Sequence, residues 1–401
     1  MVATSAPSLL EPARLGALEV RNRIVRAGTS ETMAGDRGAV TDAYVALYET
    51  LARNDVGLIF TGHLYCALRG RYARRQTGIH ADELVPGLRR VTDAVHRHGG
   101  RVFAQVAHAG SQSRVRDGEE PLAPSAVANA LTGRRVPAAG EDEIAGAVGA
   151  FAEGARRAVE AGFDGVHIHA ANGYLISELS SPVANQRTDG WGGSPALRDR
   201  FALEVVRAVR AAVPADMPVT LKLGMVDAVP GGLDLDESVP RAARLVEAGL
   251  DGLEISCGLM RLATDSARQY VAVDRRRAAE DLLVHRLLAT PAAEAYFLPC
   301  ARAVRAAAHT RIVLVGGMRT TATMERIVRD READFVALAR PLIREPDLVR
   351  QIIGGRTGRV DCTSCNLCLL HEGHHALRCW RTPRRRLAEH ALYRLRGGLR
   401  G

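Results

Sequence analysis

Short runs of apolar residues alternate with longer amphipathic stretches along most of this chain. The apolar runs lie at residues 23–27, 56–61, 102–106, 165–169, 219–223, 252–256, 312–315 and 335–339. Between them, apolar residues recur at helical spacing, as at residues 82–98, 141–161, 195–213 and 236–248. Repeated β–α units of this kind predict a parallel sheet covered by helices.

Two architectures fit this alternation, an open doubly wound sheet and a closed (β/α)8 barrel. The open fold usually carries a G-x-G-x-x-G fingerprint after an early strand, and no early strand here is followed by one. Instead, VGG ends the seventh predicted strand and AR ends the eighth, where barrels commonly bind phosphate. The pattern therefore favours an α/β fold of the TIM-barrel type.

Three segments interrupt or follow the predicted barrel. Residues 111–140 come after the third strand, and residues 259–299 form a long insertion after the sixth strand. We expect this second segment to form part of a lid over the C-terminal face of the barrel. The chain then divides into a barrel domain, residues 8–353, and a cysteine-rich extension with a basic tail, residues 354–401.

Composition narrows the class of protein. The 401 residues are 47% hydrophobic and carry a formal net charge of +9. Arginine supplies almost all of the positive charge, and Lys222 is the only lysine. This balance fits a solvated arginine-rich surface better than a nucleic-acid-binding one. The chain does not begin like a signal peptide, and no apolar run approaches ~18 residues, so we expect a cytoplasmic protein without a membrane or nucleic-acid partner.

The segment GVHIHAANGYL, residues 165–175, holds the densest group of reactive side chains. It brings His169, Asn172 and Tyr174 to the C-terminal end of a strand, which is the catalytic face of a barrel. An imidazole and an amide can both bond one carbonyl oxygen, and a phenol can supply a proton. A single histidine here would more often be a buried core residue, but the three polar residues together predict an active site.

The longer run HIHAANGYLISELSSPVANQRTDGWGG, residues 167–193, closely resembles the pattern of the Old Yellow Enzyme family. The resemblance implies that His169 and Asn172 bind the carbonyl of the substrate and that Tyr174 donates the proton. Amine-dehydrogenating relatives have other side chains at the first two positions, so this pair favours an ene-reductase. The sequence departs from the pattern at His167, where relatives commonly have an acidic residue.

The resemblance covers residues 8–350 and implies a binding site for FMN. Gln105 matches the amide that bonds the flavin pyrimidine, and Lys222 matches the cation beside flavin N1 and O2. A fixed cation there stabilises the negative charge of reduced flavin, whereas an unpaired charge in the apolar strand VTLKLGM would be costly. The remaining FMN-binding residues that the resemblance implies are Ala27, Gly28, Thr29, Ser30, Gly62, Gly316, Gly317, Ala339 and Arg340.

Four of the seven cysteines gather in DCTSCNLCLLHEGHHALRCW, as Cys362, Cys365, Cys368 and Cys379. Three cysteines at x2 spacing and a fourth downstream match the ligand spacing of an iron–sulfur cluster. The segment also resembles the iron–sulfur segment of the branch with 2,4-dienoyl-CoA reductase and trimethylamine dehydrogenase. We expect a [4Fe–4S] cluster; zinc, with a histidine of the same loop replacing a thiolate, and no metal are the alternatives.

These features predict an FMN-dependent oxidoreductase that uses NAD(P)H to reduce an activated carbon–carbon double bond conjugated to a carbonyl. An alternative is a flavin and iron–sulfur dehydrogenase or demethylase that passes electrons to a separate electron-transfer protein. A tRNA-modifying flavin barrel would need an RNA-binding segment with interleaved basic and aromatic residues, and none is evident. A non-redox barrel that binds a phosphorylated substrate would leave Gln105 and Lys222 unexplained. The expected partner is a small-molecule substrate, and the resemblance implies a homo-oligomer.

Overall fold

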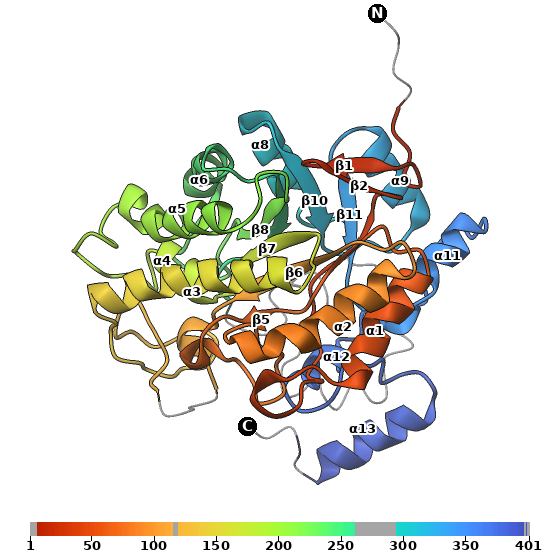
Figure 1. The fold of residues 1–401 in the computed structure, drawn as a ribbon, viewed down its shortest axis with the longest axis horizontal. Coiled ribbons are helices and arrows are strands. Elements are labelled where there is room, and N and C mark those ends of the chain that lie inside the picture. The colour runs from red at the N-terminus through yellow and green to blue at the C-terminus, as the bar shows by residue number, and fades with distance from the viewer. Residues whose placement is uncertain (1–5, 115–118, 261–293, 397, 399–401) are drawn as a thin grey trace, which may run out of the picture.

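Eight parallel strands form a closed barrel in the computed structural model, which describes residues 6–114, 119–260, 294–396 and 398 (Figure 1). Pairing of β4 with β6 closes the ring. In order around the barrel, the strands are β3 (Ile24–Arg26), β4 (Leu58–Phe60), β6 (Val102–Ala107), β7 (Gly165–Ala170), β8 (Val219–Gly224), β9 (Gly252–Ser256), β10 (Arg311–Val315) and β11 (Phe335–Leu338). Each corresponds to one of the apolar runs in the sequence, so the predicted (β/α)8 barrel is confirmed.

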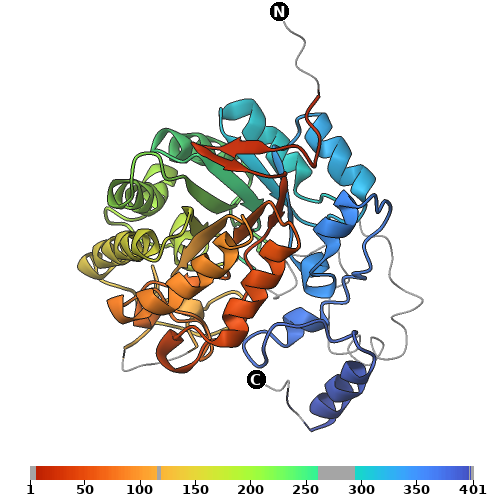
Figure 2. The same ribbon diagram turned by 45° about the vertical axis from the view of Figure 1, so that its right-hand side comes forward.

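Helices surround the barrel (Figure 2). The longer ones are α1 (Asp42–Arg53), α2 (Val85–His96), α3 (Glu141–Glu160), α5 (Pro195–Ala212), α6 (Leu235–Glu247), α8 (Leu298–Ala307) and α9 (Thr321–Arg329); shorter ones are α4 (Leu175–Ser180), α10 (Arg340–Arg344) and α11 (Leu348–Ile353). Several begin at a side chain that accepts a hydrogen bond from a backbone N–H of the first turn, as at Thr41, Ser194, Asp234 and Thr320. The helical boundaries therefore follow from local capping as well as from the apolar pattern.

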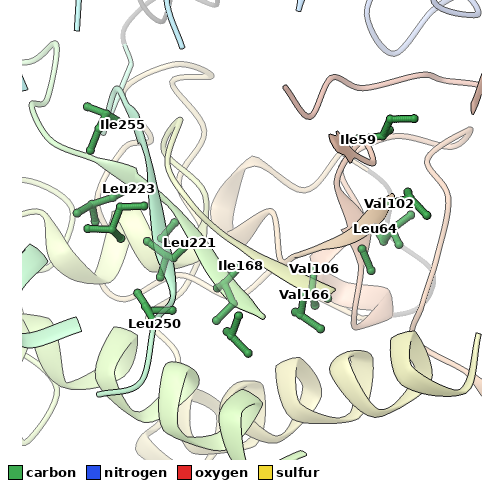
Figure 3. Close-up of a cluster of buried hydrophobic side chains, with 14 of the residues drawn as sticks. Ile59, Leu64, Val102, Val106, Val166, Ile168, Leu221, Leu223, Leu250 and Ile255 are labelled. Atoms are coloured by element: carbon green, nitrogen blue, oxygen red, sulfur yellow. The ribbon is translucent and has the colours of Figure 1, made fainter. Parts of the chain in front are cut away.

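The strands are buried on both faces, which explains their continuous apolar runs. Figure 3 shows outward-facing side chains such as Val166, Ile168 and Leu221, which belong to the large core beneath the helices. A second, smaller core that includes Phe103 fills the barrel itself. The antiparallel hairpin of β1 (Ala13–Leu15) and β2 (Leu18–Val20) contributes Leu15 to this inner core. The hairpin thereby closes the end of the barrel opposite the predicted site.

Toward the C-terminal ends of the strands, the interior of the barrel contains a polar network in place of apolar side chains. Lys222 Nζ donates to Glu254 Oε1 at 2.9 Å, and His167 Nε2 lies 2.9 Å from Glu254 Oε2. His167 Nδ1 in turn lies 2.9 Å from Thr220 Oγ1. Burial alone would raise the pKa of Glu254, but the Lys222 ammonium and the contact with His167 outweigh it and hold this pKa at about 2. Relatives commonly have an acidic residue at the position of His167 on β7. Here Glu254 of β9 places a carboxylate next to that position.

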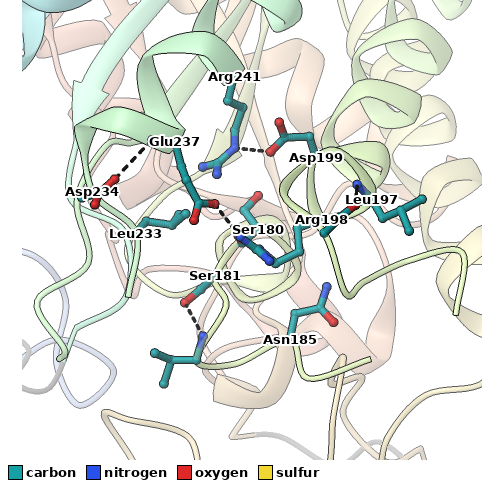
Figure 4. A network of polar contacts seen from close by, with 12 residues as sticks. Ser180, Ser181, Asn185, Leu197, Arg198, Asp199, Leu233, Asp234, Glu237 and Arg241 are labelled. Carbon is teal, nitrogen blue, oxygen red and sulfur yellow. Dashed lines mark hydrogen bonds and ion pairs between the residues drawn. The ribbon is translucent and has the colours of Figure 1, made fainter. Parts of the chain in front are cut away.

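Ion pairs hold α4, α5 and α6 together behind the segment that follows β7 (Figure 4). Arg241 of α6 donates to Asp199 of α5, and both side chains are almost completely buried. Arg198 of α5 donates to Glu237 of α6 at 2.5 Å and to the Ser180 carbonyl at the end of α4 at 3.2 Å. Breaking a buried pair leaves an uncompensated charge, so these contacts fix the position of α4 relative to the barrel.

The C-terminal residues, with α12 (Leu367–Leu370) and α13 (Arg385–Leu395), pack against the loop that follows β3. The Leu377 N–H donates to the Glu31 carbonyl at 2.7 Å, and the Gly373 N–H donates to Thr32 Oγ1 at 3.1 Å.

The predicted lid insertion falls largely on residues 261–293, which lie outside the described residues. No helix in the described ranges has both the length and the apolar composition needed to cross a bilayer.

The pairing inside the barrel can be tested by removing its cation. We expect Lys222→Met to lower the free energy of unfolding by roughly 3–5 kcal/mol at about pH 8, because Glu254 is left charged and buried. At about pH 5 the loss should be smaller, because burial raises the pKa of Glu254 once the ammonium is gone, and a protonated carboxyl is no longer a buried charge. The destabilisation is therefore full above the folded pKa of Glu254 in the variant and falls as the pH drops through it. Urea unfolding at the two pH values measures both effects.

The double variant Lys222→Met/Glu254→Gln is the control. It removes both charges, so it should recover most of the lost stability and abolish most of the pH dependence of the loss. If the double variant were as unstable as the single one, the loss would come from packing and not from the buried charge.

Candidate active site

A cavity of about 220 Å3 lies at the C-terminal ends of the barrel strands. Its walls come from segments that follow β3, β6, β7, β10 and β11, and from the C-terminal residues. The predicted site residues that line it are Ala27, Gly28, Thr29, Ser30, Gln105, His169, Asn172, Tyr174, Lys222, Gly316, Gly317, Ala339 and Arg340. The barrel therefore brings together side chains that the sequence distributes over almost its whole length.

A sharp turn after β7 presents Asn172 to the cavity. Asn172 has a φ of 59° and Gly173 a φ of 73°, in the left-handed region that asparagine and glycine tolerate best. The Asn172 N–H donates to the Cys257 carbonyl at 2.8 Å. The side-chain amide of Gln112 donates to the carbonyls of Asn172 and Gly173 at 2.9 and 2.7 Å. These bonds hold the turn in its strained conformation and so fix the direction of the Asn172 side chain.

His169 and Asn172 carry polar atoms that the protein itself does not satisfy. Both ring nitrogens of His169 and the amide oxygen of Asn172 are buried without a hydrogen-bond partner among the described residues. Burial, together with the neighbouring His63 and Lys222, lowers the pKa of His169 well below its ordinary value, so the ring is neutral. Unsatisfied buried polar atoms are costly, so this pair is arranged to bond a ligand.

Tyr174 lies within an aromatic cluster at the edge of the cavity. Its ring centroid is 4.8 Å from that of His169, 5.3 Å from that of His63 and 5.8 Å from that of Tyr72. Burial, with smaller contributions from Tyr72 and Glu372, raises the pKa of Tyr174 well above its ordinary value. The phenol is therefore protonated at neutral pH, as a proton donor must be.

Gln105 and Lys222 lie on the two strands that flank β7. In the parallel register Gln105 is opposite His167, and His169 is opposite Lys222. The Nε2 atom of Gln105 is buried and has no hydrogen-bond partner in the described part of the chain. Gly28 leaves room for this amide, because a Cβ at that position would lie 2.4 Å from Gln105 Nε2. The arrangement leaves an amide donor and an ammonium at the wall of the same cavity, one on each side of β7.

The residues after β10 and β11 form the remaining wall. Gly316 and Gly317 have φ values of 110° and 76°, and a Cβ on Gly316 would lie 2.8 Å from Phe297. Successive backbone N–H groups in such a conformation can form a concave anion site. Arg340 begins α10 and donates to the side chain of Asn366 in the C-terminal segment. This wall therefore combines backbone donors with a positive charge, as a phosphate requires.

Gly62 lies outside the lining of this cavity. Its N–H donates to Glu31 Oε1 at 2.7 Å, and a Cβ would lie 2.0 Å from Glu31 Oε2. Glu31 is itself buried and paired with Arg26 at 3.1 Å. The structure thus gives this glycine a local reason, room for a buried carboxylate, and its predicted contact with FMN stays a prediction.

Several cavity residues were not among the predicted site residues. His63, Tyr72, Gln112 and Glu372 all line the cavity. His63 comes shortly after β4, so the criterion that selected His169, a polar residue just beyond a barrel strand, would have found it. The other three lie in loops or in the C-terminal segment, and only the folded chain brings them to the barrel.

The four clustered cysteines line a second cavity, of about 740 Å3, between α10 and the C-terminal segment. Cys362 and Cys368 also line the first cavity. All four are free thiols, and burial with the neighbouring thiols raises the pKa of Cys368 to about 12. Among the described residues, no group of three or more histidine, cysteine or acidic side chains is arranged to hold a metal ion. The expected iron–sulfur cluster is therefore supported only by the clustering of the thiols around one cavity.

The histidines of the same loop form a separate group. His371 is buried, stacks on Trp380 with centroids 3.6 Å apart, and places Nε2 2.8 Å from His390 Nδ1 and Nδ1 3.1 Å from His375 Nδ1. Its ring nitrogens are thus occupied by other imidazoles, which does not favour the zinc alternative.

Comparisons with known proteins agree with this geometry. The chain matches the model of the NADH:flavin oxidoreductase / NADH oxidase family over residues 8–358. It is 36% identical over 382 residues to the 4,4'-dithiodibutanoate disulfide reductase of Rhodococcus erythropolis, covering 92% of this chain and 94% of that protein. It is 30% identical over 368 residues to the NADH oxidase of Thermoanaerobacter brockii, covering 91% of this chain and 54% of that protein.

Its structure is similar to that of the old yellow enzyme homologue from Zymomonas mobilis, with a TM-score of 0.72, 27% identity, and coverage of 88% of this chain and 95% of that one. The chain thus spans nearly all of some relatives and about half of others. The family model covers the entire barrel and the relatives align across it, so this chain belongs to the NADH:flavin oxidoreductase family, the family of Old Yellow Enzyme, and is an NAD(P)H:flavin oxidoreductase that uses FMN.

Proposed function

We propose that this enzyme uses NAD(P)H to reduce an activated carbon–carbon double bond conjugated to a carbonyl. One observation carries the proposal: His169, Asn172 and Tyr174 line the same cavity as Gln105 and Lys222. The first three are the groups needed to bind a carbonyl oxygen and to deliver a proton, and the last two suit the edge of a flavin ring.

The side chains present fit FMN. The unpartnered Nε2 of Gln105 would bond the pyrimidine, and Lys222 would lie by N1 and O2. The loop after β3, with Ala27, Gly28, Thr29 and Ser30, would lie along the ring, whereas Gly316, Gly317, Ala339 and Arg340 would hold the phosphate. Because Lys222 is already paired with Glu254, its charge would be shared between that carboxylate and the ring edge of bound FMN.

Bound FMN would supply the hydride that adds to the substrate. A ring N–H of His169 and the Nδ2 amide group of Asn172 donate hydrogen bonds to the carbonyl oxygen of the substrate, which polarises the conjugated system and stabilises its developing negative charge. A neutral imidazole suits this role, because it donates one N–H without adding a buried charge. Tyr174 then gives its phenolic proton to the carbon next to the carbonyl.

A second candidate reaction is the reduction of a disulfide. It is favoured by the 36% identity to a 4,4'-dithiodibutanoate disulfide reductase that this chain matches over 94% of its length. Disulfide reduction does not need a proton on carbon, so it would depend less on Tyr174. Comparing kcat/KM for 2-cyclohexenone and for 4,4'-dithiodibutanoate, each with NADPH and with NADH, decides between the two substrate classes.

We also propose that Cys362, Cys365, Cys368 and Cys379 bind a [4Fe–4S] cluster in an extension, residues 354–401, that follows the barrel domain, residues 8–353. The support is that the four thiols share one cavity and have the ligand spacing of such a cluster. Binding requires thiolates, so the iron would have to lower the raised thiol pKa values on binding.

Tyr174→Phe tests the proton-donor role. We expect it to slow the reoxidation of the reduced enzyme by 2-cyclohexenone by roughly 10²–10⁴-fold, the usual contribution of a positioned general acid. FMN reduction by NAD(P)H should change little, because that step requires no proton from the phenol. Anaerobic stopped-flow absorbance of the flavin measures the two half-reactions separately; an equal fall in both would contradict the role.

Cys365→Ser tests the metal site. Protein purified without oxygen should contain iron and acid-labile sulfide, and the variant should lose most of both while retaining FMN. Cys300→Ala, which removes a buried thiol of α8, is the matched control and should retain the iron. Zinc instead of iron in the unmodified protein, or iron that survives in Cys365→Ser, would contradict this ligand set.

A further inference from the structure

His63 is a buried histidine that directly contacts the proposed proton donor and has no role in the mechanism above. Its side chain is 8% exposed, and its Nε2 lies 3.3 Å from the Tyr174 phenol oxygen. Its ring also packs edge-on against Tyr72, with centroids 5.9 Å apart. The position is therefore fixed by packing, and the hydrogen-bonding state of the ring decides what it does to the phenol.

Gln76 determines which nitrogen of His63 carries the hydrogen. The Gln76 Oε1 accepts from the Tyr72 backbone N–H at 2.6 Å, and its Nε2 donates to the His63 carbonyl at 2.9 Å. Rotating the amide by half a turn would place like groups against each other at both contacts, so its orientation is fixed. The same Nε2 lies 2.7 Å from His63 Nδ1. Since a donor faces Nδ1, this nitrogen accepts, and the neutral ring carries its hydrogen on Nε2.

The Nε2–H of His63 then points to Tyr174. Glu372 Oε1 lies 3.9 Å from Nε2, beyond hydrogen-bond distance, whereas the phenol oxygen lies within it. The phenol oxygen is thus an acceptor toward His63, so its own hydrogen must be directed elsewhere. The direction that remains for this hydrogen is toward the cavity. His169 lines the cavity there and packs against the same phenol ring.

We propose that His63 is a positioning residue for proton transfer: it directs the Tyr174 hydrogen toward the substrate and stabilises the tyrosinate left by the transfer. This inference rests on the proposed role of Tyr174. In the step, the phenol O–H bond breaks, its proton forms the new C–H bond, and its electron pair stays on oxygen, where it accepts the Nε2–H of His63. A new proton from solvent restores the phenol.

The environment of Tyr174 makes such a partner necessary. The phenol is buried, and burial raises its pKa well above the ordinary value, with Tyr72 and Glu372 acting in the same direction. A tyrosinate formed there receives no compensation from those neighbours, and the more weakly acting Arg114 offsets only part of their effect. A hydrogen bond to a charged acceptor is stronger than one to a neutral group, so the His63 contact strengthens as the proton leaves. Its effect is therefore greater on the transition state than on the resting enzyme.

The test compares two replacements of His63 in the FMN-loaded enzyme. His63→Phe keeps the ring volume but removes the donor, and should slow reoxidation by 2-cyclohexenone by about 10- to 100-fold, the effect of losing one hydrogen bond to a charged group. His63→Gln places an amide nitrogen the same number of bonds from Cα as Nε2, and should recover most of that rate. His309→Gln, at an exposed position, is the control and should behave like the unmodified enzyme.

A second measurement determines the hydrogen position on His63 in the unmodified enzyme. Nitrogen-15 NMR of histidine-labelled protein, with the His63 signals assigned by their absence in His63→Gln, should show hydrogen on Nε2 and an accepting Nδ1 at neutral pH. Hydrogen on Nδ1, or on both nitrogens, would overturn the inference.

The outcomes separate this inference from the function on which it rests. If Tyr174→Phe is slow but His63→Phe reoxidises at the unmodified rate, the role of His63 is wrong and the proton donor stands. If His63→Gln is as slow as His63→Phe, His63 acts only through packing, and the inference is again overturned. If Tyr174→Phe itself is not slowed, the proposed proton donor fails, and the inference fails with it.

Discussion

The buried charge of Lys222 is the constraint on which the arrangement of side chains in the C-terminal half of this barrel depends. A lone ammonium inside an apolar barrel would be very costly, so the sequence must provide an anion and orient it. Glu254 does so from β9, and His167 and Thr220 complete the hydrogen bonds of the carboxylate and of the imidazole. Because this pair holds the Lys222 ammonium on a barrel strand, the cation has a fixed position at the cavity wall and does not depend on a loop.

Several polar groups that line the cavity are not paired in this way. There His169, Asn172 and Gln105 present buried polar atoms that nothing in the described chain satisfies. The two regions therefore differ in their hydrogen bonding. The network around Glu254 is complete within the protein, whereas these groups at the cavity have hydrogen-bonding capacity left for a ligand. The rigid network around Glu254 and the Gln112-held turn keep these groups in place, so a ligand need not order them when it binds.

The barrel, and the gathering of most predicted site residues around one cavity, could be predicted from the sequence because both depend on the order of residues along the strands. Apolar runs marked every barrel strand, and polar residues immediately beyond β7 marked the catalytic face. What could not be predicted depends on contacts between distant loops. Gln76 acquires its effect on His63 only when two loops meet, and Glu372 reaches the cavity only because the C-terminal segment folds back. Gly62 remains a prediction as an FMN-binding residue, and the structure adds a local steric cause for glycine there in the buried carboxylate of Glu31.

The C-terminal segment links the two cavities physically. Its Leu377 N–H bonds the Glu31 carbonyl, next to the loop proposed to lie along the flavin, and its Asn366 accepts from Arg340 at the phosphate wall. Cys362 and Cys368 border both cavities, and Glu372 lies on the substrate side. Any change that reorganises the thiols, including the binding of a metal, must therefore act on the shape and charge of the substrate cavity. In this chain the cysteine-bearing segment therefore forms part of the wall of the candidate active site.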